Sequence, residues 1–547
     1  MQSNFFIVKG IAIAISLTAC SVSSDKVIEP LIVLGAQPQQ NKNADIALVE
    51  LKEEWSSLSK VNHKPDWFQD AKLGIYTHWG PTSTANIGMK WASGWYGLDL
   101  YMDEVYDWKT GDVKLFGDKK QPKASYTYQH HVKAHGDPAD FGYKDIIKQF
   151  NPDKFNAQEW ADLFKLSGAK FAGPVAVHHD NFAMWDSDVT RWNSKAFTGK
   201  DITGELKSAI EQRGLKFLTS FHHAFTWVYY ANAYKFDATP ETADLYTDQH
   251  ELTDFEPNDR FHEQWFAMLK EVIDKYQPDV IWFDWWVEVL NEEYRKKFVA
   301  YYYNKGKEWG KDVVINYKNT SFPDGIGVLD YERGRPNKLK DEFWMTDTSP
   351  GAWFYYENAK FVEPNQIVDI LIDIVSKNGL MLLNVPPNPD GSIPAEMKDM
   401  LAKLGEWLAI NGEGIYETRP WTVFGEGPTR INRGGHKIEK QKIAYTDKDI
   451  RFTKKGDNTI FAFVMAAPMQ DIVIQTLNTH LSVLEGKIKS IEMLGSNEKV
   501  NWQLNENGLV IRKPNVLPSD FALGYKISLY QEQEVGIGGE DPGTNGE

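Results

Sequence analysis

The sequence has very little cysteine and no excess of basic charge. Cys20 is the only cysteine among 547 residues, so no intrachain disulfide can form. The net charge is −16, which argues against nucleic-acid binding because a phosphate backbone requires a basic surface. Metal-binding motifs, a glycine-rich phosphate loop and a serine nucleophile elbow are also absent, and we expect no cofactor and no metal.

The N-terminus carries a short apolar segment, residues 5–17, followed by Leu-Thr-Ala-Cys ending at Cys20. This segment is too short to span a bilayer and is typical of a cleavable signal. Its ending resembles the bacterial lipobox, although a plain signal peptide with a chance cysteine is the alternative. We expect residues 1–20 to be a lipoprotein signal peptide, Cys20 to be lipidated, and residues 21–45 to be a polar tether. The protein would then reach the membrane of the cell envelope (outer membrane or periplasm) only through its lipid anchor.

The next region alternates between apolar runs and amphipathic stretches. With 42% hydrophobic and 25% charged residues, the composition is that of a soluble globular protein. Strands separated by helices imply a parallel sheet, and the length favours a closed barrel over residues 46–420. The predicted strands are 73–77, 171–177, 217–221, 280–283, 313–316 and 380–385, and the predicted helices include 156–167, 261–276 and 395–411.

The pattern of apolar and polar residues changes after Trp421. Short alternating runs at 459–464, 471–475, 488–494 and 509–511 are broken by Asn, Gly and Asp, which predicts an antiparallel β-sandwich over 421–530. Residues 531–547 are rich in Gly and Glu and are expected to be disordered. The predicted fold is therefore α/β, a (β/α)8-type barrel followed by a C-terminal antiparallel β-sandwich.

Two apolar runs of the predicted barrel end directly in polar side chains. Val280–Phe283 leads into Asp284, and Val175–Val177 leads into His178 and His179. The C-terminal ends of barrel strands carry the active site, so these residues predict a shared pocket. Trp285 and Trp286 follow the carboxylate at once, and flat aromatic faces beside it would suit a sugar ring.

A second histidine pair, His222 and His223, closes the run 218–221. Adjacent residues on a strand point to opposite faces, so neither pair can easily hold one metal ion. At a strand end, where the chain turns, both members could reach the hydroxyls of a sugar.

Several motifs, in the same order, resemble the α-L-fucosidases of glycoside hydrolase family 29. Residues 67–80 resemble the family's opening strand, residues 178–182 resemble its strand end with paired histidines, and residues 281–284 resemble the strand that carries its nucleophile. The last strand and closing helix resemble 382–394 and 405–416.

The resemblance implies a retaining glycosidase without a cofactor. Asp284 would attack the anomeric carbon, and a second carboxylic acid would protonate the leaving oxygen and then activate water. His78, His178 and His179 would bind the sugar's hydroxyls, and His222 is added to them because of its place at a strand end. Trp95 and Trp282 would form apolar walls.

The sequence departs from the family pattern at two places. Gly94 replaces a glutamate that the family often uses to hold the sugar, and Met345 stands where an acid is often found. For the acid/base we favour Glu332, beside Arg333, which could orient a carboxylate or meet an anionic substituent. Glu342 is the rival.

Three functions follow from this reading. The first is an exo-acting α-L-fucosidase that acts on fucosylated glycans or polysaccharide. The second is an α-L-galactosidase, because L-galactose differs from L-fucose only by a hydroxyl on C6. The third is a catalytically silent, surface glycan-binding lipoprotein. The linkage, the leaving group, acceptance of sulfated fucose and the oligomeric state are left open.

Overall fold

The computed structural model describes residues 50–104, 124–431 and 443–530, apart from 482 and 485. The predicted signal peptide with Cys20, the tether and the C-terminal tail lie outside these residues. Within the described part of the chain, no helix is both long and apolar enough to cross a membrane.

Eight parallel strands form one sheet in the order β6-β5-β4-β3-β2-β1-β8-β7. The two outer strands meet through a parallel bridge between Asp330 and Met345, which closes the sheet into a barrel. The strands are β1 (Leu73–Thr77), β2 (Phe171–Val177), β3 (Lys216–Phe221), β4 (Val280–Phe283), β5 (Val314–Tyr317), β6 (Val328–Leu329), β7 (Trp344–Thr348) and β8 (Gly379–Asn384).

Six of these strands confirm predicted ones to within one residue at each end, because they are continuous buried runs. β6 and β7 had not been predicted. β6 is only two residues long, and the sequence Trp-Met-Thr-Asp-Thr of β7 lacks the apolar run by which a buried strand is recognised. All five residues of β7 are nevertheless buried.

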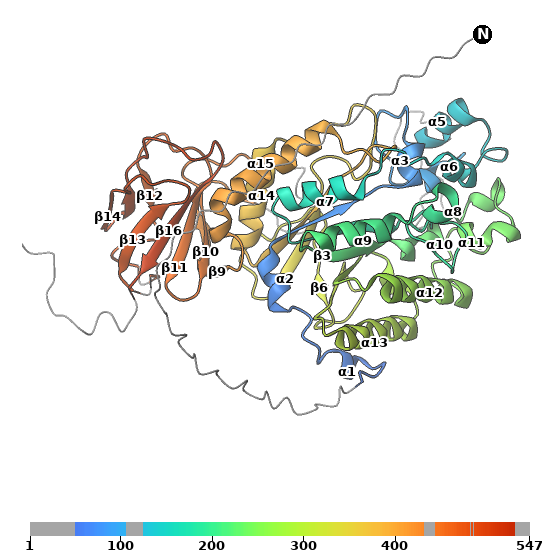
Figure 1. Ribbon diagram of the computed structural model, residues 1–547, viewed down its shortest axis with the longest axis horizontal. Helices are drawn as coiled ribbons and strands as arrows, with labels where there is room; N and C mark the ends of the chain where they lie inside the picture. Colours follow the sequence, from blue (N-terminus) through green and yellow to red (C-terminus); the bar gives the residue numbers. More distant parts are fainter. Residues whose placement is uncertain (1–49, 105–123, 432–442, 482, 485, 531–547) are drawn as a thin grey trace, which may run out of the picture. The chain divides into compact units, whose positions relative to one another are not determined.

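Helices pack around the barrel between most of the strands (Figure 1). The long ones are α7 (Ala157–Leu166), α9 (Ile202–Gln212), α12 (Asp259–Tyr276), α13 (Glu292–Trp309), α14 (Pro364–Ser376) and α15 (Ala395–Asn411). Three of them confirm predicted helices: α7, α12 and α15. Residues 319–327 and 330–343, all of them described, contain no helix, so two of the eight repeats connect their strands by loops alone.

Further helices occupy the loops at the rim and the entry to the barrel. They are α1 (Trp55–Leu58), α2 (Asp66–Ala71), α3 (Pro81–Ala85), α4 (Tyr96–Asp99), α5 (Tyr126–His135), α6 (Tyr143–Gln149), α8 (Ser194–Thr198), α10 (Thr226–Tyr229) and α11 (Ala243–Tyr246). The long excursion predicted between Trp108 and Asp140 includes α5, and its residues 108–123 lie outside the described part.

The barrel interior is a compact apolar cluster drawn from alternate strand positions. It includes Tyr76 of β1, Leu218 of β3, Trp282 of β4, Val314 of β5 and Met345 of β7. Successive strand residues point to opposite faces of the sheet. A residue two positions after one of these interior residues therefore also points inward, but lies nearer the C-terminal end of the barrel. This periodicity selects the side chains that form the floor of any site at that end.

The C-terminal region forms two antiparallel sheets, as predicted. Its strands are β9 (Arg419–Glu426), β10 (Ile450–Lys455), β11 (Thr459–Val464), β12 (Ile472–Ile474), β13 (Ile488–Met493), β14 (Trp502–Asn505), β15 (Gly508–Ile511) and β16 (Leu523–Leu529). The five-stranded sheet contacts the barrel through α14, where Arg451 of β10 donates from Nε to Asp373 at 2.8 Å.

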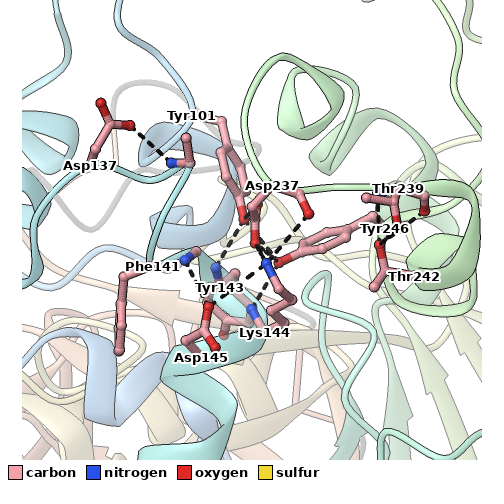
Figure 2. Close-up of polar contacts among 12 residues, drawn as sticks. Tyr101, Asp137, Phe141, Tyr143, Lys144, Asp145, Asp237, Thr239, Thr242 and Tyr246 are labelled. Atoms are coloured by element: carbon pink, nitrogen blue, oxygen red, sulfur yellow. Dashed lines mark hydrogen bonds and ion pairs between the residues drawn. The ribbon is translucent and has the colours of Figure 1, made fainter.

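A buried polar network holds two rim loops together (Figure 2). The Asp237 carboxylate accepts hydrogen bonds from the hydroxyls of Tyr101 at 2.7 Å and Tyr246 at 2.9 Å, and it pairs with the Lys144 ammonium. The Tyr101 hydroxyl also accepts from the backbone N–H of Tyr143. This network ties the loop after β1 to the loop after β3, and so fixes the rim above both strands.

Candidate active site

A cavity of about 220 Å³ lies at the C-terminal ends of the barrel strands. His78, His178, His222, Asp284 and Lys318 each follow the last residue of a barrel strand by one position. The other side chains around the cavity come from strand β7 and from rim loops: Gly94, Trp95, His179, Trp285, Glu332, Asp347, Trp353 and Phe354. The shared pocket predicted from Asp284 and the histidine pair is thus present.

Asp284 lies at the centre of a set of charged and hydrogen-bonding partners. Its Oδ1 lies 2.9 Å from Nζ of Lys318, and its Oδ2 lies 3.2 Å from Nδ1 of His222 and 3.5 Å from Nε2 of His179. Burial alone raises the pKa of Asp284, but the Lys318 ammonium and the His222 ring hold this pKa well below its usual range. Asp284 therefore stays ionised in a dry pocket, as a nucleophile requires.

Lys318 connects this carboxylate to others. Its Nζ lies 3.5 Å from Oε2 of Glu332 and 3.3 Å from Oδ2 of Asp347. Burial lowers the pKa of Lys318, but Asp284 and Asp347 together raise it well above its ordinary value, so the ammonium is permanent. Below it, burial and the neighbouring Asp347 raise the pKa of Asp330 well above its usual range, which keeps Asp330 protonated.

Two histidines offer acceptor nitrogens to the cavity. Asn384 Oδ1 accepts from the backbone N–H of His78 and faces its ring Nδ1, both at 3.0 Å, which assigns the ring proton to Nδ1. His179 donates from Nδ1 to the carbonyl of His222 at 2.8 Å. Burial lowers the pKa of His179 to about 4 and that of His78 well below its usual range. Both rings are neutral, and His78 presents Nε2 as an acceptor for a hydroxyl, whereas Nε2 of His179 lies 3.5 Å from Oδ2 of Asp284.

A hydrogen-bonded turn positions the histidine pair of β2. Asp180 follows His179, and its carboxylate accepts from the Tyr143 hydroxyl at 2.7 Å and from the Thr82 hydroxyl at 3.2 Å. Nδ1 of His178 is buried without a hydrogen-bond partner among the described residues.

Two groups of ligand atoms are compact enough for a metal ion. Those of His78, His178 and His222 lie within 4.8 Å of one another, as do those of His179, His222 and Asp284. His222 belongs to both groups, yet its Nε2 accepts from Ser220 and its Nδ1 donates to Asp284. Lys318 already neutralises Asp284. These commitments favour sugar hydroxyls over a cation as the partners of the cluster.

Aromatic rings line one side of the cavity, but not all those predicted. Trp95 and Trp285 lie with ring centroids 5.8 Å apart, and both line the cavity. Trp282, predicted as a wall, is fully buried in the barrel interior one layer below Asp284, where its Nε1 donates to Asp330. The two-residue period of β4 puts Trp282 on the same face as Asp284 but deeper, so Trp285 takes the wall position instead.

Gly94 also borders the cavity. A Cβ at this position would lie 3.5 Å from the Phe354 ring and 4.0 Å from His178, which is ordinary contact. A longer side chain at position 94 would therefore have to pack against Phe354 and His178.

The two candidate acid/base residues lie in different places. Glu332 borders the cavity with its side chain 15% exposed, and the backbone of its neighbours pairs with β7 (Tyr331 N–H to Met345 O, Arg333 N–H to Asp347 O). Glu342 precedes β7, at the N-terminal end of that strand, and its side chain is 80% exposed beside Lys64. Of these two residues, only Glu332 can therefore reach a substrate that contacts Asp284.

Arg333 points away from the Asp284 cavity. Its guanidinium lies 4.3 Å from the centre of the Trp353 ring, and Nη2 donates to the carbonyl of Gly351 at 2.6 Å. Met345, in the position where an acid is often found, is fully buried in the barrel interior.

Lys318 and Asp347 were not identified from the sequence. The signal for Lys318 was available, because it follows the predicted strand that ends at Asn316 and stands at a strand end as Asp284 does. Asp347 could not be found in this way, since β7 was not recognised as a strand.

Comparisons with known proteins agree with this geometry. The family model described as Alpha-L-fucosidase matches residues 38–413, and that of the alpha-L-fucosidase C-terminal domain matches residues 442–529. Tissue alpha-L-fucosidase of Rattus norvegicus is 29% identical over 487 residues, which cover 86% of this chain and 89% of that protein. Alpha-L-fucosidase of Dictyostelium discoideum is 28% identical, with 87% and 94% covered.

Among solved structures, Thermotoga maritima alpha-fucosidase in complex with fucose matches with a TM-score of 0.65 and 28% identity. The match covers 87% of this chain and 100% of the Thermotoga maritima chain. Because the family model spans most of the chain and the fold agrees, this protein belongs to the alpha-L-fucosidase family of glycoside hydrolases, family 29.

Proposed function

We propose that this protein is a retaining, exo-acting α-L-fucosidase in which Asp284 is the nucleophile and Glu332 the acid/base. The cavity beside Asp284 has a volume of about 220 Å³, which suits one sugar residue and so favours removal of a terminal unit. The substrate would be a fucosylated glycan or polysaccharide.

The observation that carries this proposal is the contact of one ammonium with both carboxylates. Nζ of Lys318 lies 2.9 Å from Asp284 and 3.5 Å from Glu332. Oδ1 of Asp284 and Oε2 of Glu332 can therefore be no farther apart than about 6.4 Å, whereas the carboxyl groups of inverting enzymes lie about 6.5–9.5 Å apart to leave room for a water. The separation favours the retaining geometry.

The reaction then takes two displacements at the anomeric carbon. In the first, an Asp284 oxygen bonds to that carbon while the glycosidic oxygen leaves and takes the proton of Glu332. In the second, the Glu332 carboxylate takes a proton from water, whose oxygen displaces Asp284 and releases the free sugar. Two inversions give net retention. Lys318 neutralises the carboxylate charge that remains after each step.

The site also bears on the two alternatives. A catalytically silent glycan-binding protein does not require an ionised carboxylate and a second carboxylic acid that both contact one buried cation, as Asp284 and Glu332 contact Lys318. An apolar wall discriminates only weakly against one added hydroxyl, so α-L-galactosides belong among the substrates to be tested.

The test compares wild type with Asp284→Gly on an aryl α-L-fucoside and on the matching α-L-galactoside. We expect wild type to prefer the fucoside and the variant to lose several orders of magnitude in kcat, as the loss of covalent catalysis requires. Azide should restore turnover and give a glycosyl azide of inverted configuration. A near-normal rate in Asp284→Gly would refute the assignment, and a preference for the galactoside would support the second function.

We also propose that the catalytic barrel spans residues 46–420 and the sandwich 421–530, behind a signal peptide of residues 1–20 and a lipid anchor at Cys20. The short apolar segment before the lone cysteine supports this arrangement. Anchoring would place the enzyme in the cell envelope, where it would meet extracellular glycans.

A further inference from the structure

A second cavity, of about 830 Å³, adjoins the cavity of Asp284. Glu332 and Trp353 line both cavities. The second cavity extends from them toward α14 and includes Phe361, Asp369 and Tyr445. It is almost four times as large as the first, and the two meet at the residue that we assign as acid/base.

The position of Glu332 determines which part of a substrate enters the second cavity. A general acid must lie within hydrogen-bond reach of the oxygen that it protonates. That oxygen joins the fucose residue to the leaving group. With fucose beside Asp284, the leaving group must continue past Glu332, on the side where Trp353 and the second cavity lie.

Trp353, which lies between the two cavities, is held in place by Arg333. The Arg333 guanidinium stacks on the Trp353 ring at 4.3 Å and donates to the carbonyl of Gly351 at 2.6 Å. These contacts hold the Trp353 ring between the cavities, where it can contact a sugar residue of the leaving group.

Three residues that line the second cavity carry polar atoms without a hydrogen-bond partner among the described residues. Nε of Arg335, Oδ1 of Asp369 and the hydroxyl of Tyr445 are buried and make no hydrogen bond to the described residues. Arg335 is 3% exposed and Asp369 is 6% exposed. Buried polar groups are normally hydrogen-bonded, so these three atoms point to a ligand or to ordered water.

The chemistry of these atoms indicates hydroxyls rather than an anion. The set contains a donor on Arg335, an acceptor on Asp369 and a phenol on Tyr445 that can do both, and sugar hydroxyls match all three. The charged side chains nearer the rim are mixed in sign, with Lys360 opposite in charge to Glu363. A sulfate or carboxylate on the leaving group would meet Asp369 and Glu363 as well as the cations.

We propose that the second cavity is a subsite for the leaving group and holds an uncharged oligosaccharide of at least two sugar residues. This inference rests on the proposed function. It assigns the protein to branched or extended fucosylated oligosaccharides, in which Trp353 contacts the sugar next to fucose and Arg335, Asp369 and Tyr445 bind the hydroxyls of a farther one.

The experiment measures kcat/KM on an aryl α-L-fucoside and on fucosides whose leaving group is one neutral sugar, two neutral sugars, or two sugars of which one carries a sulfate. The variants are Tyr445→Phe and Asp369→Asn, which keep the shape of each side chain. Tyr525→Phe is the matched control, because its hydroxyl is also buried without a described partner but lies in β16 of the sandwich.

For wild type we expect kcat/KM to rise when the second neutral sugar is added. For Tyr445→Phe and Asp369→Asn, the ratio of kcat/KM on the two-sugar substrate to that on the aryl fucoside should fall about 2- to 10-fold, the loss of about one hydrogen bond. Tyr525→Phe should keep the wild-type ratio.

Three results would overturn the inference: no gain from the second sugar, equal losses on all substrates in the two cavity variants, or a preference for the sulfated leaving group. Aryl fucoside hydrolysis by wild type tests the proposed function separately. An enzyme that cleaves the aryl fucoside but gains nothing from a longer leaving group would retain the proposed function and lose only this subsite.

Discussion

Replacing Lys318 by methionine removes an ammonium that contacts both carboxylates of the proposed mechanism. Lys318 Nζ is 2.9 Å from Asp284 Oδ1, and it holds the pKa of Asp284 low against the opposing effect of burial. His179 cannot replace it, since burial lowers the pKa of His179 to about 4 and that ring is neutral at higher pH.

The expected result is a shift of the acidic limb of the kcat/KM profile to higher pH. An opposite charge at this distance typically changes the pKa of a carboxyl by about 1–3 units. The limb moves to higher pH because Lys318 lowers the pKa of Asp284 and keeps this carboxyl ionised at low pH. Without the cation, Asp284 becomes protonated at a higher pH. The acidic limb of Lys318→Met should therefore lie about 1–3 pH units above that of wild type.

The assay is hydrolysis of an aryl α-L-fucoside between pH 3 and pH 9. Unpaired buried charges will also destabilise the variant, but the position of the limb does not depend on the concentration of folded enzyme. Lys318→Arg is the matched control, because it keeps the charge and should keep the limb in place. If Lys318→Met is active and its acidic limb coincides with that of wild type, Lys318 does not control the ionisation of Asp284.

Three further predictions address other parts of the chain. Glu332→Ala should be slow on natural fucosides, much less impaired on activated aryl fucosides, and flattened in the basic limb of its pH profile, because only poor leaving groups need the proton. Glu342→Ala is its control and should behave as wild type in both assays; the reverse pattern would exchange the two roles. Cys20→Ala should move the enzyme from the membrane fraction to the soluble fraction with its activity intact, and a wild type already soluble in its native host would contradict lipidation. Asp373→Asn should lower the free energy of unfolding by about 3–5 kcal/mol in urea titrations, because it breaks a buried ion cluster. Burial raises the pKa of Asp373, but Lys377, Arg451 and Arg335 lower it below the usual range, so this stabilisation is complete above the unfolded pKa of about 3.9 and is lost only as the pH falls below it. An equal stability of Asp373→Asn and wild type at pH 7 would contradict the role of the cluster.

The sequence by itself determined the elements whose signal is local. The runs at β1, β2 and β4 are continuous and apolar because both faces of these strands are buried, and each ends in a polar residue at the C-terminal end of the barrel. His178, His179 and Asp284 could be placed in one site for this reason, since parallel strands bring their C-terminal ends to the same edge. The change to short alternating strands likewise predicted the antiparallel sheets before any contact was known.

Only the tertiary structure decided which side chains meet within that edge. Glu332 and Glu342 are ten positions apart and look alike in the sequence, but pairing with β7 places one at each end of the barrel. Trp282 resembled a wall of the site, and the inward stagger of β4 places it in the core instead. The ion pair of Lys318 with Asp284 joins neighbouring strands through side chains 34 residues apart, and no local pattern records such a distance.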